Sequence, residues 1–313
     1  MKKLLFLVFT LSLVGCNEKF VTPNVQVQQI DNAPGVTNSA KELTRVTDQA
    51  LGEFYPAISP DGTRILYHGR DDTKTGNERW TVYMKEVGRP GVTPLTAGFS
   101  TNPTWSSDGQ EFYYTYLKPA KSIIVKSRVG GMGISYVSAN AMGEEDNNPT
   151  LHLNPKFDKV LFNTKIGSSY QVATMDKNGM NFTLLLEGNR PKYHPTRNQI
   201  LFQKAVGAHT HLFLYDNESG QIMQLTSGDN TNMEASFSPN GQYITYVSNM
   251  DGQQHVYMMR SDGTNPVQLT TGTLMNGGPV WSKDGYIYFH SNAGNQRGNT
   301  WDYADIWRLR PVY

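Results

Sequence analysis

The sequence has one cysteine, Cys16, among its 313 residues, so no disulfide can form within the chain and the fold must depend on its apolar core. Its formal net charge is only +1, from 28 Lys and Arg against 27 Asp and Glu. This balance creates no long-range field, so binding to nucleic acid is not expected. The chain also lacks a GxSxG elbow, an HExxH motif and a phosphate-binding glycine loop, which removes the commonest signatures of hydrolases, zinc proteases and nucleotide-binding proteins.

The residues that are present favour β-structure. Aromatic residues make up 11% of the chain, together with 29 glycines and 16 prolines. Aromatic side chains suit strands, whereas Gly and Pro supply the backbone geometry of tight turns. Many short strands joined by tight turns, and therefore an all-β fold, are predicted.

The N-terminus has the pattern of a secretion signal. Two lysines, Lys2 and Lys3, precede an apolar run from Leu4 to Val14 that is too short to span a bilayer comfortably as a helix. The run ends in Leu-Val-Gly-Cys, which resembles a bacterial lipobox, so residues 1–15 are predicted to be a signal peptide and Cys16 the lipidated first residue of the mature protein. The lipid would then be the chain's contact with the membrane.

A tether is expected after the lipid. Residues 16–40 are rich in Gln, Asn, Pro, Val and Thr without strand or helix periodicity, so no fold is assigned to them. By the sorting rule of Gram-negative lipoproteins, which the lipobox resemblance implies, Asn17 rather than Asp favours the outer membrane. We expect the protein to face the periplasm, with the cell surface as the alternative.

One short motif recurs along the rest of the chain. It reads FYPAISPDG at residues 54–62, NPTWSSDG at 102–109, EASFSPNG at 234–241 and GPVWSKDG at 278–285, with worn copies at 148–155 and 190–195. Steps between the equivalent positions are 42 to 47 residues, measured at Pro56, Pro103, Pro149, Pro191, Ala235 and Pro279. This period fits a four-stranded propeller blade, so residues 41–313 are predicted to form a six-bladed β-propeller.

The motif is typical of a tight turn between two strands and predicts the first hairpin of a blade. In Ser-Pro-Asp-Gly the proline presets φ for a tight turn, and the glycine accepts a positive φ. The large apolar residue before each turn should lie between neighbouring sheets; these residues are Ile58, Trp105, Leu151 or Leu153, Tyr193, Phe237 and Trp281. They are predicted to be core.

Ring closure is predicted from the two ends of the repeat region. The last copy ends after its third strand, whereas Lys41-Glu42-Leu43-Thr44 resembles the outer-strand pattern Gln-Leu-Thr found at residues 224–226 and 268–270. This N-terminal segment can complete the sixth blade and leave no open sheet edge.

The repeats resemble the PD40, or WD40-like, repeats of the TolB propeller. The resemblance covers roughly residues 41–313 and implies a propeller of the cell envelope. TolB itself also carries an N-terminal α/β domain, which has no counterpart here. Similar repeats occur in oligogalacturonate lyases and in the propellers of prolyl oligopeptidase-type enzymes, and the latter also need a hydrolase domain.

Binding residues are expected at the mouth of the central channel, in the loops that precede the inner strands and those that join second to third strands. The preferred candidates for contact with a partner are Arg70, Arg190, Glu234, Trp301 and Asp302. His209 and His211 are a weaker candidate pair for a divalent ion, because closely spaced histidines hold metals. However, His211 is in register with polar residues that begin the third strand of every repeat, which indicates a structural role. No cofactor is expected beyond such an ion.

The leading hypothesis is a non-catalytic lipoprotein that uses a propeller face to bind an envelope protein or peptide. The alternative is a carbohydrate-active enzyme of the oligogalacturonate-lyase type, and a further alternative is sensing of a small ligand in the channel. The chain lacks a full histidine set and a wide basic cleft for an acidic sugar, which favours the scaffold.

Overall fold

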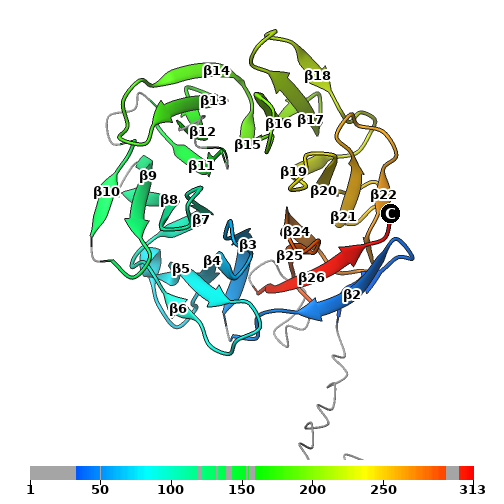
Figure 1. Ribbon diagram of the computed structural model, residues 1–313, viewed down its shortest axis with the longest axis horizontal. Helices are drawn as coiled ribbons and strands as arrows, with labels where there is room; N and C mark the ends of the chain where they lie inside the picture. The colour runs from blue at the N-terminus through cyan, green and yellow to red at the C-terminus, as the bar shows by residue number, and fades with distance from the viewer. Residues whose placement is uncertain are drawn as a thin grey trace, which may run out of the picture. The chain divides into compact units, whose positions relative to one another are not determined.

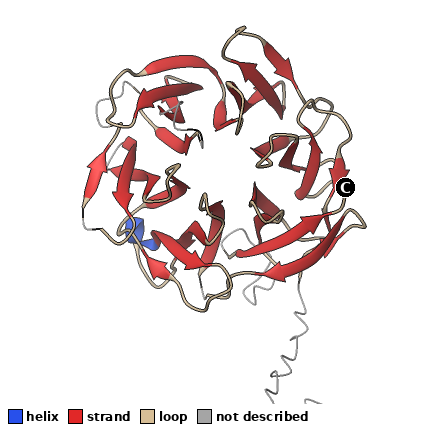
Figure 2. Cartoon of the chain, in the orientation of Figure 1, coloured by secondary structure: helices blue, strands red, loops and turns tan. Residues whose placement is uncertain are grey.

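The structure is a computed structural model that describes residues 33–49, 51–118, 121–131, 133–138, 143–152, 154, 159–293 and 303–313. Within these ranges the chain is almost entirely β-structure, with one short 3-10 helix, η1 (Gly76–Arg79) (Figure 2). No helix in the described ranges is long and apolar enough to cross a membrane. The predicted signal peptide and Cys16 lie outside the described residues.

Six four-stranded antiparallel sheets stand around a central axis as the blades of a propeller (Figure 1). Blades 1 to 3 contain β3 (Gly52–Ile58), β4 (Arg64–Arg70), β5 (Trp80–Glu86) and β6 (Thr93–Pro94); β7 (Ser100–Trp105), β8 (Glu111–Lys118), β9 (Lys121–Arg128) and β10 (Ile134–Tyr136); β11 (Asp146–Leu151), β12 (Lys159–Ile166), β13 (Ser169–Asp176) and β14 (Thr183–Glu187).

Blades 4 to 6 repeat this order, except that the last blade takes its outer strand from the N-terminal part of the chain. They contain β15 (Asn189–Tyr193), β16 (Gln199–Val206), β17 (His209–Asp216) and β18 (Ile222–Gln224); β19 (Asn232–Phe237), β20 (Tyr243–Ser248), β21 (His255–Arg260) and β22 (Val267–Gln268); β24 (Asn276–Trp281), β25 (Ile287–Ser291), β26 (Asp305–Pro311) and β2 (Ala40–Arg45). The predicted six-bladed propeller is confirmed.

The first hairpin of blade 1 forms as the motif predicts. The amide of Gly62 donates to the carbonyl of Ser59 at 2.8 Å, and Gly62 has a φ of +80°. The Asp61 carboxylate accepts from the amide of Thr63 at 3.0 Å, and the Ser59 hydroxyl accepts from the amide of Arg64 at 2.9 Å. The side chains of the turn therefore satisfy backbone groups that the sheet leaves unpaired.

The large residue before each turn packs between blades, as expected. Trp105, Leu151, Phe237 and Trp281 are buried, Ile58 and Tyr193 are partly buried, and Leu153 lies outside the described residues. The indole of Trp105 in blade 2 donates to the carbonyl of Ala57 in blade 1 at 2.9 Å. The guanidinium of Arg64, also from blade 1, stacks over the same indole at 4.6 Å. The inner hairpins of blades 1 and 2 are thus fixed against each other.

The N-terminal strand closes the ring. β2 pairs antiparallel with β26, with Ala40 opposite Pro311 and Arg45 opposite Trp307. Beyond the strand, the amide of Val46 donates to the carbonyl of Ile306 at 2.8 Å, and the Thr47 hydroxyl accepts from the amide of Ile306 at 2.9 Å. Figure 1 shows this blue strand lying outside the red C-terminal strand.

The tether expected over residues 16–40 ends earlier than the sequence indicated. β1 (Gly35–Val36) pairs with β23 (Thr270–Thr271), which follows the outer strand of blade 5, and the Thr37 hydroxyl donates to the carbonyl of Gln268 at 2.6 Å. A Cβ at position 35 would stand 2.8 Å from the carbonyl oxygen of Thr271, so glycine permits the close approach. Two residue pairs are too short to produce a periodicity that the sequence could show.

Candidate functional site

A ring of six residues in the left-handed backbone conformation surrounds the central axis. Each inner strand has a β-bulge at the same place, where its register against the second strand shifts. The residues with positive φ at this bulge are Tyr55 (51°), Asn102 (50°), Asn148 (54°), Arg190 (47°), Glu234 (56°) and Gly278 (54°). Side chains other than Gly and Asn rarely adopt this conformation, so its repetition at Tyr55, Arg190 and Glu234 requires external support.

Hydrogen bonds between blades provide that support. In five blades the bulge amide donates to a second-strand side chain of the preceding blade: Tyr55 to Nδ1 of His290 (3.4 Å), Asn102 to Nδ1 of His68 (3.1 Å), Asn148 to Oγ1 of Thr115 (3.3 Å), Arg190 to Oδ1 of Asn163 (3.2 Å) and Glu234 to Oε1 of Gln203 (2.8 Å). Burial lowers the pKa of His68 to about 3 and that of His290 to about 4, so both rings are neutral at physiological pH and can accept.

The sixth position uses a different acceptor. The second strand of blade 5 carries Val247 there, which has no side-chain acceptor. Instead, Oε2 of Glu234 accepts from the amide of Gly278 at 2.7 Å. A Cβ on Gly278 would stand 2.9 Å from both His290 and Tyr55, so glycine leaves the room that these side chains occupy.

Arg190, Tyr55 and Glu234 form one hydrogen-bonded cluster from blades 4, 1 and 5. The Arg190 guanidinium donates to the Tyr55 hydroxyl at 2.9 Å and stacks over its ring at 4.6 Å. The Tyr55 hydroxyl donates to Oε1 of Glu234 at 2.6 Å, which lies 3.5 Å from the guanidinium. Burial opposes both charges, yet their mutual attraction prevails: the pKa of Glu234 lies below its usual value and that of Arg190 above it.

Replacement of Glu234 by Ala is expected to destabilise the protein by about 2–3 kcal/mol, because it leaves the partly buried Arg190 without its counter-charge and the Gly278 amide without an acceptor. Urea unfolding measures the change. Glu234→Gln retains a neutral acceptor and should lose less. Since the pKa of Glu234 is lowered in the fold, its contribution is present above about pH 4.5 and is lost as the pH falls through the folded-state pKa. Equal stability of the wild type and Glu234→Ala would contradict this role.

A cavity of about 280 Å³ extends from this ring along the axis to the turns between first and second strands. Its wall is formed by the residue two positions after each bulge residue: Ala57, Thr104, Thr150, Lys192, Ser236 and Val280. At the turns it is lined by Ser59, Pro60, Pro195, Ser238, Pro239, Ser282 and Lys283. The ring of bulge residues is the inner end of the cavity, because none of the residues that precede the bulges lines it.

The structure brings together two of the five residues proposed for partner binding. Arg190 and Glu234 line the cavity. Arg70 lies at the end of β4, where it pairs with Asp72 at 2.9 Å, and it does not line the cavity. Trp301 and Asp302 lie outside the described residues. The loops considered from the sequence stand at the opposite end of the strands from the turns that line the cavity.

His211 takes part in a contact between blades 4 and 5 that recurs between blades 5 and 6. It is buried, and its Nδ1 lies 3.4 Å from Nδ2 of Asn232 in the next blade. The rings of His209 and His211 make only a loose contact, because their centroids are 6.5 Å apart. Among the described residues, no three His, Cys, Asp or Glu side chains are grouped so that they could hold a metal ion.

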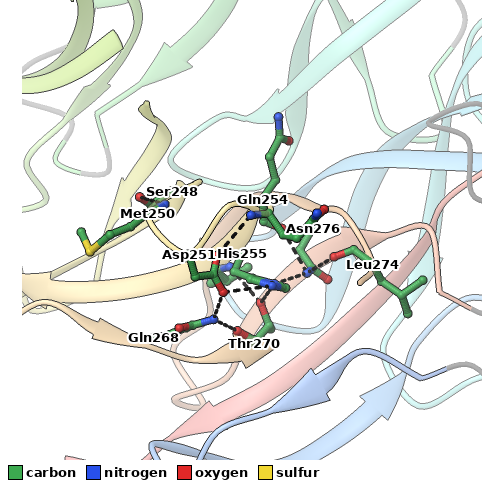
Figure 3. Close-up of polar contacts among 11 residues, drawn as sticks. Ser248, Met250, Asp251, Gln254, His255, Gln268, Thr270, Leu274 and Asn276 are labelled. Atoms are coloured by element: carbon green, nitrogen blue, oxygen red, sulfur yellow. Dashed lines mark hydrogen bonds and ion pairs between the residues drawn. The ribbon is translucent and has the colours of Figure 1, made fainter. Parts of the chain in front are cut away.

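Figure 3 shows the same contact one blade further on, around His255. Nδ1 of His255 lies 3.2 Å from Nδ2 of Asn276 and 3.4 Å from the Thr270 hydroxyl, and its Nε2 lies 3.3 Å from Asp251. The Thr270 hydroxyl accepts from the amide of Val256 at 2.9 Å. These bonds join β23 and the third strand of blade 5 to the inner strand of blade 6, and His211 has the corresponding position in blade 4.

Sequence reasoning did not find Tyr55 or Lys192. Both lie at repeat positions where the residue type differs strongly between blades. At the position of Tyr55 the blades share a positive φ and not a residue type. The available signal was that Lys192 is the one long cationic residue where the other blades have Ala, Thr, Ser or Val. This signal identifies a site residue only when it is known that the position of Lys192 faces the axis.

The fold and its axial cavity define the chain as a six-bladed β-propeller of four-stranded antiparallel blades. Residues 187–303 match the family model described as the TolB beta propeller domain. The structure is similar to TolB from Acinetobacter baumannii, with a TM-score of 0.63, 16% identity and coverage of 81% of this chain and 66% of that one. It is also similar to putative TolB from Agrobacterium tumefaciens, with a TM-score of 0.63, 17% identity and coverage of 87% and 98%.

Enzymes share the architecture too. An oligogalacturonate lyase in complex with manganese superposes with a TM-score of 0.56 at 13% identity, covering 88% of this chain and 96% of that one. A curated relative, the uncharacterized peptidase YuxL of Bacillus subtilis, is 23% identical over 215 residues, which is 62% of this chain but only 29% of that protein. At these identities the solved structures establish the fold alone.

Proposed function

We propose that the protein is a non-catalytic envelope scaffold that binds a protein or peptide at the cavity face of its propeller. The observation that carries this proposal is the cavity itself, which is lined by prolines, aromatic rings and small hydroxyl side chains from all six blades. Recognition sites are concave and mostly apolar, with a few polar groups that fix orientation. The Arg190–Tyr55–Glu234 cluster closes its inner end with charges that neutralise each other.

The rigidity of the cavity supports binding of an extended segment. Tight hairpin turns and hydrogen bonds between blades hold the lining residues before any partner arrives. A preorganised surface loses little conformational entropy on association, which favours affinity. The lipid on Cys16 that the sequence predicts would hold this surface at the outer membrane, facing the periplasm or the cell exterior. TolB-like propellers as a fold class are consistent with such a role.

The proposal can be tested by site-specific photo-cross-linking in intact cells. Lys283 is exposed at the cavity mouth, whereas Val206 is exposed at the end of β16, at the other end of the strands. A photoreactive residue at position 283 should give a discrete cross-linked protein or peptide, and the same residue at position 206 should not. Equal products at both positions, or none at position 283, would contradict a cavity-face scaffold.

The alternative enzyme class has its own assay. The purified protein is offered oligouronides with Mn²⁺ or Ca²⁺ while absorbance from new unsaturated ends is followed. We expect a flat trace. Turnover that is lost in His209→Ala would overturn the scaffold proposal, and His209 is the better test position because His211 contributes to packing between blades.

A further inference from the structure

One cation in the cavity wall has no counter-charge. Lys192 on β15 lines the cavity and is partly buried. No hydrogen bond or ion pair joins it to any carboxylate of the described residues, and Arg190 is the charged neighbour that acts on it. Burial of an unpaired ammonium group costs free energy, which a bound anion would recover.

The two neighbouring wall positions carry hydroxyl groups. Thr150 on β11 and Ser236 on β19 occupy the position of Lys192 in the preceding and following blades, and all three line the cavity. Both are buried residues, and neither hydroxyl has a hydrogen-bond partner among the described residues. An ammonium group flanked by two hydroxyl donors is a suitable arrangement for an oxyanion.

The net charge of the cavity also favours an anionic ligand. Arg190 is neutralised by Glu234, while Lys192 in the wall and Lys283 at the mouth add two further positive charges. In a concave site with low-dielectric walls, such an excess attracts anions. A volume of about 280 Å³ is near the lower end of small-ligand pockets, so it suits one group or chain end rather than a folded surface.

We propose that Lys192, with the hydroxyls of Thr150 and Ser236, forms a carboxylate-binding subsite within the cavity. This inference rests on the proposed function and names what the cavity recognises: a carboxylate, from the C-terminus of a peptide or from a small dicarboxylic acid. The Arg190–Tyr55–Glu234 cluster forms the inner end of the subsite and limits how far the ligand enters.

Binding should depend on pH. Burial, and then Arg190, lowers the pKa of Lys192 to about 8, so its charge is present at pH 7 and is lost as the pH rises above 8. The other charged or titratable lining groups are Arg190, Glu234, Tyr55, Tyr193 and Lys283. The pKa values of Tyr55 and Tyr193 are raised by burial and that of Glu234 is lowered, so these three keep their protonation states between pH 7 and pH 9.

The test uses the full chain, purified in detergent, and isothermal titration calorimetry at pH 7. The probes are tetra-alanine with a free C-terminus, tetra-alanine amide, and glutarate. The free-acid peptide or glutarate should bind, and the amide should not. Lys192→Met should weaken binding at least about tenfold, whereas Lys192→Arg should retain it, since guanidinium also pairs with carboxylate. Affinity of the wild type should fall between pH 7 and pH 9, and that of Lys192→Arg should not.

The outcomes are distinct. Tighter binding of the peptide assigns the subsite to a chain terminus, and tighter binding of glutarate assigns it to a small acid; both support the subsite. Equal binding of acid and amide, unchanged binding in Lys192→Met, or no binding of any probe overturns it. If Lys192→Met unfolds, the acid–amide comparison and the pH profile of the wild type decide. Cross-linking at position 283 without carboxylate binding would overturn this inference and leave the scaffold proposal standing.

Discussion

Deletion of residues 41–47 is expected to lower the thermal midpoint by about 10 °C or more, because it removes most of the strand that closes the ring. The deletion removes the pairing of Lys41, Thr44 and Arg45 with β26 and the bonds of residues 46 and 47 to Ile306. At about 1 kcal/mol for each lost hydrogen bond, with further loss from exposed apolar surface, the change amounts to roughly 5 kcal/mol. The bare edge of β26 would also be open to pairing with another chain, so aggregation should increase.

Differential scanning calorimetry of the full chain measures this effect. The matched control is deletion of residues 17–29, which lie before the first strand and should leave the midpoint unchanged. Equal tolerance of the two deletions would mean that β2 contributes little to ring closure.

Cys16→Ser is expected to abolish incorporation of labelled fatty acid and to move the protein from the membrane pellet to the soluble fraction. Several acyl chains on one cysteine give stable attachment, whereas a single chain holds only marginally, so loss of the acceptor thiol should release the protein almost completely. Asn17→Ala, which keeps the thiol, is the control and should remain in the pellet. Unchanged membrane association of Cys16→Ser would contradict lipid anchoring and leave the attachment to another part of the chain.

The fold could be predicted because its signals are local and repeated. Ser59, Pro60, Asp61 and Gly62 encode a turn that needs no tertiary contact, and recurrence of that turn gives the blade period. Strand β2 could be assigned to the last blade since an open edge would otherwise remain.

The cavity cluster could not be predicted in the same way. Tyr55 and Glu234 are 179 residues apart and meet only because blades 1 and 5 approach the same axis. Tyr, Arg and Glu also give no sign of a left-handed backbone, which only Asn102, Asn148 and Gly278 of the ring make plausible from sequence. The sequence predicts Arg190 and Glu234 only as charged loop residues, and the structure shows that they lie together beside the cavity.

The end of the propeller that carries the cavity also depends on tertiary geometry. Channel loops were sought at the ends of the strands that include Arg70, whereas the cavity extends toward the turns at Pro60, Pro195 and Pro239. The loops at both ends recur once in each blade, so periodicity does not show at which end the cavity lies. Apart from the bulge residues themselves, the residues that line the cavity all lie between the bulge ring and the turns that join first and second strands.

Hydrogen–deuterium exchange of the protein, alone and with the partner captured by cross-linking at position 283, tests the central claim most directly. The account predicts slower exchange in the turns at residues 59–63, 238–242 and 282–286, which surround the cavity mouth. Turns at the other end of the strands, such as residues 206–209 and 248–254, should exchange as before. Protection confined to those latter turns, with the cavity mouth unchanged, would contradict the proposal that the partner binds at the cavity face.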